Sequence, residues 1–134
     1  MKTFSRVLMV LMVVLCVVAA QAQSSVILKG NVPFNFVVGD RNLPSGQYTI
    51  SAVTQNVESW YDASGRGLFM INTLPMGKEA SQDTYKLVFH RYGDNYILTE
   101  VWSAGSSHLV NSGRTAQQIA KNQKFEVVAV LMTR

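Results

Sequence analysis

The chain has 134 residues, 12 basic and eight acidic side chains, a formal net charge of +4 and a single cysteine. The charges are scattered without a run of Lys or Arg, which disfavours a nucleic-acid or anionic-membrane surface because such partners bind a concentrated basic stripe. One cysteine excludes a framework of disulfides within the chain.

The first element in chain order has the pattern of a signal peptide. Lys2 and Arg6 precede an unbroken apolar run over residues 7–20, and residues 20–22 (AQA) have the small-x-small pattern of a signal-peptidase site. As a helix, the apolar run would span about 21 Å, which is short of the roughly 30 Å hydrocarbon core of a bilayer. We therefore favour a cleaved signal peptide over residues 1–22 and not a membrane anchor.

Cleavage after residue 22 would leave one domain of residues 23–134 without cysteine. Leu15 before Cys16 is too bulky for lipoprotein processing, so Cys16 would be removed with the leader. The remaining ten basic and eight acidic side chains would have a net charge of +2. An exported domain without cysteine is common in bacteria, so we expect a periplasmic or extracellular protein.

The first strands are predicted from the stretch VPFNFVVGDRNLPSGQYTI, residues 32–50. Its apolar side chains alternate with period 2, which is typical of a strand with one buried face. Pro33 places this piece at an edge or at a strand start. The segments GDRN and LPSG are typical of turns. We expect strands over residues 24–38 and 47–53, and we assign the stretch to the fold and not to a reaction centre.

Two hairpins are predicted next. Residues 57–61 and 67–74 flank a Gly/Ser-containing turn, and residues 84–103 (TYKLVFHRYGDNYILTEVWS) surround Gly93-Asp94, a type II′ turn signature. The register of the second hairpin follows from its turn, and it pairs the following residues: Arg91 with Tyr96, Phe89 with Leu98, Leu87 with Glu100, and Tyr85 with Trp102.

The C-terminal part predicts a loop, a short helix and a last strand. Residues 103–113 are rich in Gly and Ser, and Thr115 and Gln118 have capping-box spacing for a helix over residues 116–121. The apolar segment 125–132 predicts a closing strand in a central position. The chain as a whole predicts an all-β fold, an antiparallel β-sandwich or small barrel of about seven strands with one short helix near the C-terminus.

Two blocks resemble a group of small exported bacterial β-rich proteins that are uncharacterised. Residues 32–48 have the pattern VPFxFxxGxxxLPxGxY, and residues 86–102 have the pattern KLVFxRYGxxYxLxxVW. Members of this group are similar in carrying a signal peptide before the two blocks. The resemblance implies export and a β-rich fold, and it brings no reaction, ligand or site residue.

Aromatic side chains are the candidate ligand-binding residues. Trp60 and Tyr61 lie beside a Gly/Ser turn, and Trp102 lies in the second hairpin. Such side chains can form a flat platform on which a sugar stacks, or the wall of a pocket for an apolar ligand. The alternative is packing in the core and across strands, because aromatic residues are favoured in strands.

The histidines and carboxylates do not form a metal-binding or catalytic motif. His90 lies within a strand without a second donor at ligand spacing, and His108 follows Ser107 without the turn that exposes a nucleophile. Glu100 lies in an apolar strand, where an inward position would require a cation such as Arg91 and a rim position is the alternative. We expect no metal and no cofactor.

These observations favour an exported, non-catalytic binding or structural module of the bacterial envelope or extracellular space. The alternatives are a carrier of a small apolar ligand in a β-barrel cavity and a carbohydrate-binding module. We expect no enzyme, no nucleic-acid partner and no stable membrane span after signal cleavage. An envelope partner or a small ligand fits this interpretation.

Overall fold

The computed structural model describes residues 27–121 and 123–134. The expected signal peptide over residues 1–22 lies outside the described residues. The described part is mostly strand with one short helix, so the all-β class is confirmed. Its elements are β1 (Ile27–Val32), β2 (Phe36–Val38), β3 (Arg41–Leu43), β4 (Gly46–Thr54), β5 (Val57–Tyr61), β6 (Gly67–Glu79), β7 (Lys86–Tyr92), β8 (Asn95–Ser103), β9 (Ser106–Val110), α2 (Arg114–Ala120) and β10 (Glu126–Leu131).

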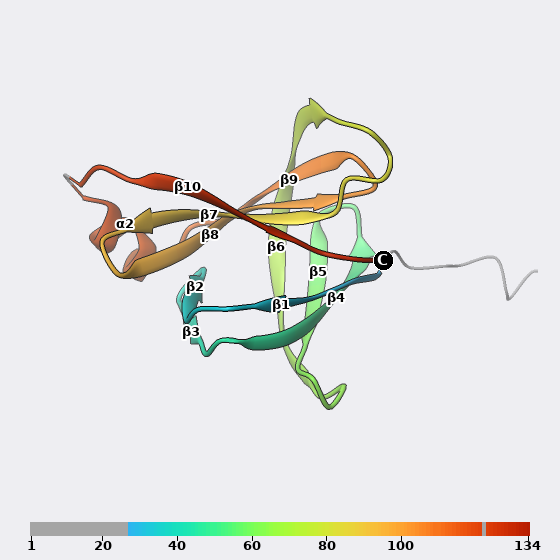
Figure 1. Cartoon of the computed structure of the whole chain (residues 1–134), viewed down its shortest axis with the longest axis horizontal. Coiled ribbons are helices and arrows are strands. Elements are labelled where there is room, and N and C mark those ends of the chain that lie inside the picture. Colours follow the sequence, from blue (N-terminus) through green and yellow to red (C-terminus); the bar gives the residue numbers. More distant parts are fainter. Residues whose placement is uncertain (1–26, 122) are drawn as a thin grey trace, which may run out of the picture.

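The strands form one curled sheet with two halves (Figure 1). The first half contains β1, β4 and β5, and the second contains β9, β8, β7, β10, β2 and β3. The sheet is mixed, because β2 runs parallel to β8 and the other pairs are antiparallel. The long strand β6 belongs to both, because its first part pairs with β5 and its second part pairs with β9. Two backbone hydrogen bonds of 2.7 Å between Lys29 and Thr133 join β1 to the segment after β10. The halves can therefore enclose a common core.

The core between the halves is filled by aromatic and aliphatic side chains. Trp60 of β5 is fully buried, and its ring centroid lies 6.1 Å from that of Phe36 and 5.9 Å from that of Tyr48. Phe36 also meets Phe89 of β7 edge to face, at 5.4 Å. The alternation predicted for residues 32–50 places Val32, Phe36 and further members of that face in this core. Aromatic rings from several strands therefore occupy the centre of this core.

A second, smaller cluster positions the helix. Ala116 of α2 packs with Val37, Tyr92 and Ile97. The predicted capping box is wrong: the N-cap residue is Gly113, without a side-chain cap. The reason is a competing partner, since the backbone amide of Thr115 donates to a carboxylate oxygen of Asp40 at 3.4 Å.

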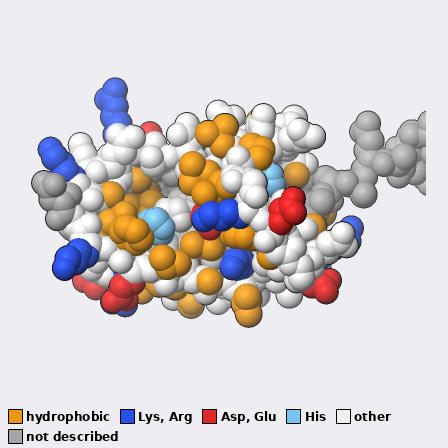
Figure 2. Space-filling model, turned by 90° about the horizontal axis from the view of Figure 1, so that it is seen from above, with side chains coloured by type: hydrophobic (Ala, Val, Ile, Leu, Met, Phe, Trp, Pro, Cys, Tyr) orange, Lys and Arg blue, Asp and Glu red, His pale blue; other side chains and the backbone are white. Residues whose placement is uncertain are grey.

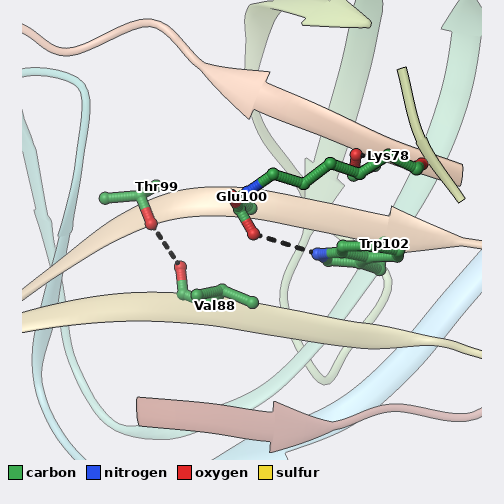
Figure 3. A network of polar contacts seen from close by, with 6 residues as sticks. Lys78, Val88, Thr99, Glu100 and Trp102 are labelled. Atoms are coloured by element: carbon green, nitrogen blue, oxygen red, sulfur yellow. Dashed lines mark hydrogen bonds and ion pairs between the residues drawn. The ribbon is translucent and has the colours of Figure 1, made fainter. Parts of the chain in front are cut away.

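The hairpin of β7 and β8 follows the predicted register only near its turn. Arg91 pairs with Tyr96 and Phe89 with Leu98, as expected. The register then shifts, so that Glu100 pairs with Val88 and Trp102 with Lys86. Thr99 is the extra residue, and its hydroxyl donates to the carbonyl oxygen of Val88 at 3.1 Å (Figure 3). Such a bulge reverses which side chains face the core.

Two further expectations are corrected at the C-terminal part. Residues 106–110, expected as loop, form β9, because the turn at Ala104 and Gly105 has positive φ at both positions, a geometry that suits a tight hairpin. The last strand, β10, lies at an end of the sheet, where among the described strands it pairs with β7 alone. Val128 and Val130 pack against the core, whereas Val127 and Leu131 are 65% and 81% exposed.

We expect Gly105→Ala to lower the free energy of unfolding by about 2 kcal/mol or more, as measured by urea denaturation. Gly105 has a φ of 81°, and a Cβ atom there would lie 2.6 Å from the backbone oxygens of Ala80 and Ser81. The control is Gly93→Ala, because Gly93 has a φ of 60° but open space around it, so only the backbone cost of about 1 kcal/mol should remain. Equal losses in both variants would contradict the packing around Gly105.

Candidate functional site

A hollow of about 220 Å³ opens at one end of the molecule, between β1, β4, β5 and the turn from β8 to β9. We call it the Glu58 pocket. Its wall includes apolar Leu28, Ile50 and Ala52 and polar Glu58, Ser106 and His108. Leu28 and Ile50 are 2% exposed and belong to the core, whereas Ala52 lies at the open rim. The pocket therefore has a buried apolar floor and an opening that is exposed to solvent.

Glu58 is the most unusual side chain of this pocket. It lies on β5, is 7% exposed, and its Oε2 atom is buried without a hydrogen-bond partner in the described structure. Burial raises the pKa of Glu58 to about 7, because the charged form loses its water. At neutral pH the carboxyl group is therefore divided between its protonated and ionised forms, a state typical of groups that bind or exchange protons.

His108 adds a second free polar atom to the same wall. It lies on β9, between Val101 of β8 and Pro75 of β6, and its Nδ1 atom is buried without a hydrogen-bond partner among the described residues. Glu58 Oε2 and His108 Nδ1 are not bonded to each other, since each lacks a partner. A ligand or ordered water that reaches either atom would supply its missing hydrogen bond.

Glu58 was missed by the sequence analysis, although the sequence contains a signal for it. Residues two apart in a strand share a face, so Glu58 must face the same way as Trp60 in β5. If the large apolar Trp60 is buried, Glu58 is turned inward with it. The sequence predicts no catalytic role for His108 because Ser107 lacks the turn that exposes a nucleophile. In the structure the Ser107 hydroxyl donates to the carbonyl oxygen of Lys78 at 3.2 Å.

The candidate platform of Trp60, Tyr61 and Trp102 is not formed as an exposed surface. Trp60 is fully buried and Trp102 is 8% exposed, while Tyr61 is half-buried. Trp60 stacks on Phe69 at 5.7 Å, and Trp102 lies on β8. The two tryptophans therefore do not form an exposed pair, and Trp60 takes the alternative of packing in the core. A binding role for Tyr61, which lines a shallow hollow, stays a prediction.

Glu100 lies outside the core, and its carboxylate is paired with a basic side chain. Its carboxylate accepts a hydrogen bond from Trp102 Nε1 at 3.1 Å, and it forms an ion pair with Nζ of Lys78 at 3.2 Å (Figure 3). Burial raises the pKa of Glu100, but the bonds from Trp102 and Lys78 outweigh it and hold the pKa below its usual value. The partner is thus Lys78 and not Arg91, because the bulge at Thr99 turns Glu100 away from the core.

A second hollow of about 420 Å³ lies around this ion pair, on the face formed by β6, β8 and β9. Leu74 and Leu109 on this face are 59% and 38% exposed. His90, the other histidine, lines the same hollow and stacks on Phe125 at 4.1 Å. In Figure 2 hydrophobic side chains surround a basic side chain near the middle of the view. The side chains of Lys78, Thr99 and Glu100 in this hollow already have partners, unlike Glu58 in the other pocket.

Among the described residues, no three His, Cys, Asp or Glu side chains are grouped as they would be to hold a metal ion. The described part of the chain also contains no helix with the length and apolarity needed to cross a bilayer. Comparison of the chain with protein-family models, curated proteins and solved structures gives no match.

Proposed function

We propose that the chain is an exported, non-catalytic binding module of the bacterial envelope or extracellular space, and that it holds a small ligand in the Glu58 pocket. Export is supported by the leader pattern of residues 1–22 and by the absence of cysteine from residues 23–134. The ligand site is supported by one observation above all: Glu58, whose Oε2 atom is buried without a hydrogen-bond partner in the described structure, belongs to the wall of a pocket with an apolar floor.

The unpaired polar atoms of Glu58 and His108 favour a ligand on energetic grounds. A buried polar atom without a hydrogen bond destabilises a protein by about 1–3 kcal/mol, and more where the group is charged. Glu58 Oε2 and His108 Nδ1 both carry such a cost in the same wall. A ligand that bonds to either atom recovers part of it, which makes the pocket a favourable binding place. Binding sites typically combine apolar walls with a few polar groups placed in this way.

The non-catalytic assignment is supported by the surroundings of the two titratable groups. General base catalysis on a serine requires a nucleophile within hydrogen-bond reach of the base. In the described structure Glu58 Oε2 and His108 Nδ1 bond to no hydroxyl group, and Ser107 donates elsewhere. The arrangement is suited to holding a ligand and lacks the oriented nucleophile of a hydrolase.

Native mass spectrometry of the processed protein tests this function. We expect an N-terminus at residue 23 and a retained small molecule, or a compound from a screening set that raises the melting temperature. The effect should be lost in Ala52→Phe, whose ring would fill the rim of the pocket, and kept in Val53→Phe, because Val53 is 52% exposed and does not line it. Retention in both variants, or an unprocessed N-terminus, would contradict the proposal.

A further inference from the structure

The residues described in the wall of the Glu58 pocket include an acidic side chain but no lysine or arginine. The acidic side chain belongs to Glu58. The other polar side chains are hydroxyl and amide groups and the imidazole of His108. Glu58 thus lacks the cation that Glu100 finds in Lys78. Within the described part of the chain, Glu100 has a counter-ion and Glu58 has none.

A positively charged ligand would supply that counter-ion in a place from which water is excluded, so that its bond to Glu58 is strong. Hydrogen bonds between a cationic donor and a carboxylate are shorter and stronger than neutral ones, and exclusion of water strengthens them further. Glu58 is 7% exposed, so a donor that reaches Oε2 lies in a dry environment. An anion would face an unscreened negative charge there, and a neutral apolar compound would leave Oε2 without a bond.

The size of the pocket limits the rest of the ligand. A dry cavity of about 150 Å³ accommodates benzene, and the Glu58 pocket has about 220 Å³. One six-membered ring or an alkyl chain of similar volume, together with one charged nitrogen, fits this space. The aliphatic side chains of Leu28 and Ile50 provide the apolar contact on the pocket floor.

We propose that the Glu58 pocket binds a small primary ammonium compound, with its charged nitrogen on Glu58 Oε2 and its ring or alkyl group against Leu28 and Ile50. The inference rests on the proposed function, namely that this pocket is the binding site. It adds the chemical class of the ligand and the residue that selects it.

The test compares three compounds of one shape: cyclohexylammonium, cyclohexanol and cyclohexanecarboxylate. Calorimetric titration of the purified protein at pH 8 gives their affinities, and amide NMR shifts locate them. At this pH an alkylammonium group stays protonated, and most Glu58 is ionised. We expect saturable binding of cyclohexylammonium at least tenfold tighter than that of cyclohexanol, with shifts at the pocket, and weaker binding still of the carboxylate.

Variants separate the inference from the proposed function. Glu58→Gln keeps the shape of the side chain and should weaken cyclohexylammonium at least tenfold, while leaving cyclohexanol unchanged. Glu126→Gln is the control, because this carboxylate is 77% exposed and lies on β10, away from the pocket. Equal binding of cyclohexanol and cyclohexylammonium, or no effect of Glu58→Gln, would overturn the ammonium class and keep the pocket as a site. Absence of binding by all three would overturn the inference, while the proposed function is decided by the retained ligand and the Ala52→Phe variant.

Discussion

Replacement of Glu58 by glutamine is expected to raise the free energy of unfolding by about 3 kcal/mol at pH 8 and to leave it nearly unchanged at pH 4. The reason is the raised pKa of Glu58, about 7 in the folded protein against an ordinary value of 4.5. Between these two values the folded state keeps a proton that the unfolded state releases. The contribution of Glu58 is therefore fully present below about pH 4.5 and is lost as the pH rises to about 7.

Urea denaturation at intervals from pH 4 to pH 8 measures this effect. The wild-type protein should lose stability across the window from about pH 4.5 to about pH 7, and Glu58→Gln should remove that loss, because glutamine does not titrate. Glu126→Gln again serves as the control, since an exposed carboxylate 3.9 Å from Arg91 contributes little to stability. A pH profile of Glu58→Gln parallel to that of the wild type would show that Glu58 is hydrated and not buried.

Trp60→Ala is expected to lower the free energy of unfolding by about 3–5 kcal/mol, the range found when a large buried aromatic residue is truncated. Trp60 is fully buried and lies against Phe36, Tyr48 and Phe69. The truncation would leave a cavity among rings contributed by several strands, and relaxation would fill it only in part. Urea denaturation followed by circular dichroism measures the loss.

Two comparison variants show whether the loss comes from the buried ring of Trp60. Trp60→Phe should cost less than half as much, because it keeps one ring and removes Nε1, a buried donor without a partner in the described structure. Phe125→Ala should cost about 1 kcal/mol or less, because Phe125 is 50% exposed. A loss below 1 kcal/mol for Trp60→Ala would mean that the two halves of the sheet do not share this core.

The parts of the fold that follow from alternation were predictable from the sequence. Period 2 in residues 32–50 identifies the side chains that reach the core. The Gly93-Asp94 turn fixes the hairpin register as far as Phe89 and Leu98, and Gly93 has the positive φ that this turn requires. Both features are local, so neighbouring residues suffice to specify them.

The features that the sequence did not predict depend on single extra residues or on distant partners. One bulged residue, Thr99, moves Glu100 and Trp102 to the outer face, and local propensity does not distinguish a bulge from a regular strand. The helix N-terminus differs because Asp40, far away in the chain, takes the amide of Thr115. Strand β9 was expected as loop because its serines are frequent in turns, while its pairing with β6 and β8 decides its conformation.

The candidate site was unpredictable for a related reason. Glu58 looks like one of several carboxylates near turns, and only its shared face with Trp60 indicates that it is buried. The position of His108 beside the same hollow requires the curl of the sheet, which brings β9 near β5 through the long strand β6. Glu58 and His108, which are 50 residues apart in sequence, therefore belong to one wall that no local sequence pattern predicts.

The central claim is that Glu58 is a buried carboxyl group in a pocket open to a ligand, with no counter-ion among residues 27–121 and 123–134. Carbon NMR of the side-chain carboxyl groups, with the Glu58 signal assigned by its loss in Glu58→Gln, follows the ionisation of Glu58 directly. We expect the midpoint of the Glu58 titration at about pH 7, and a lower midpoint when cyclohexylammonium is added. A midpoint near 4.5, the ordinary value for glutamate, would contradict it.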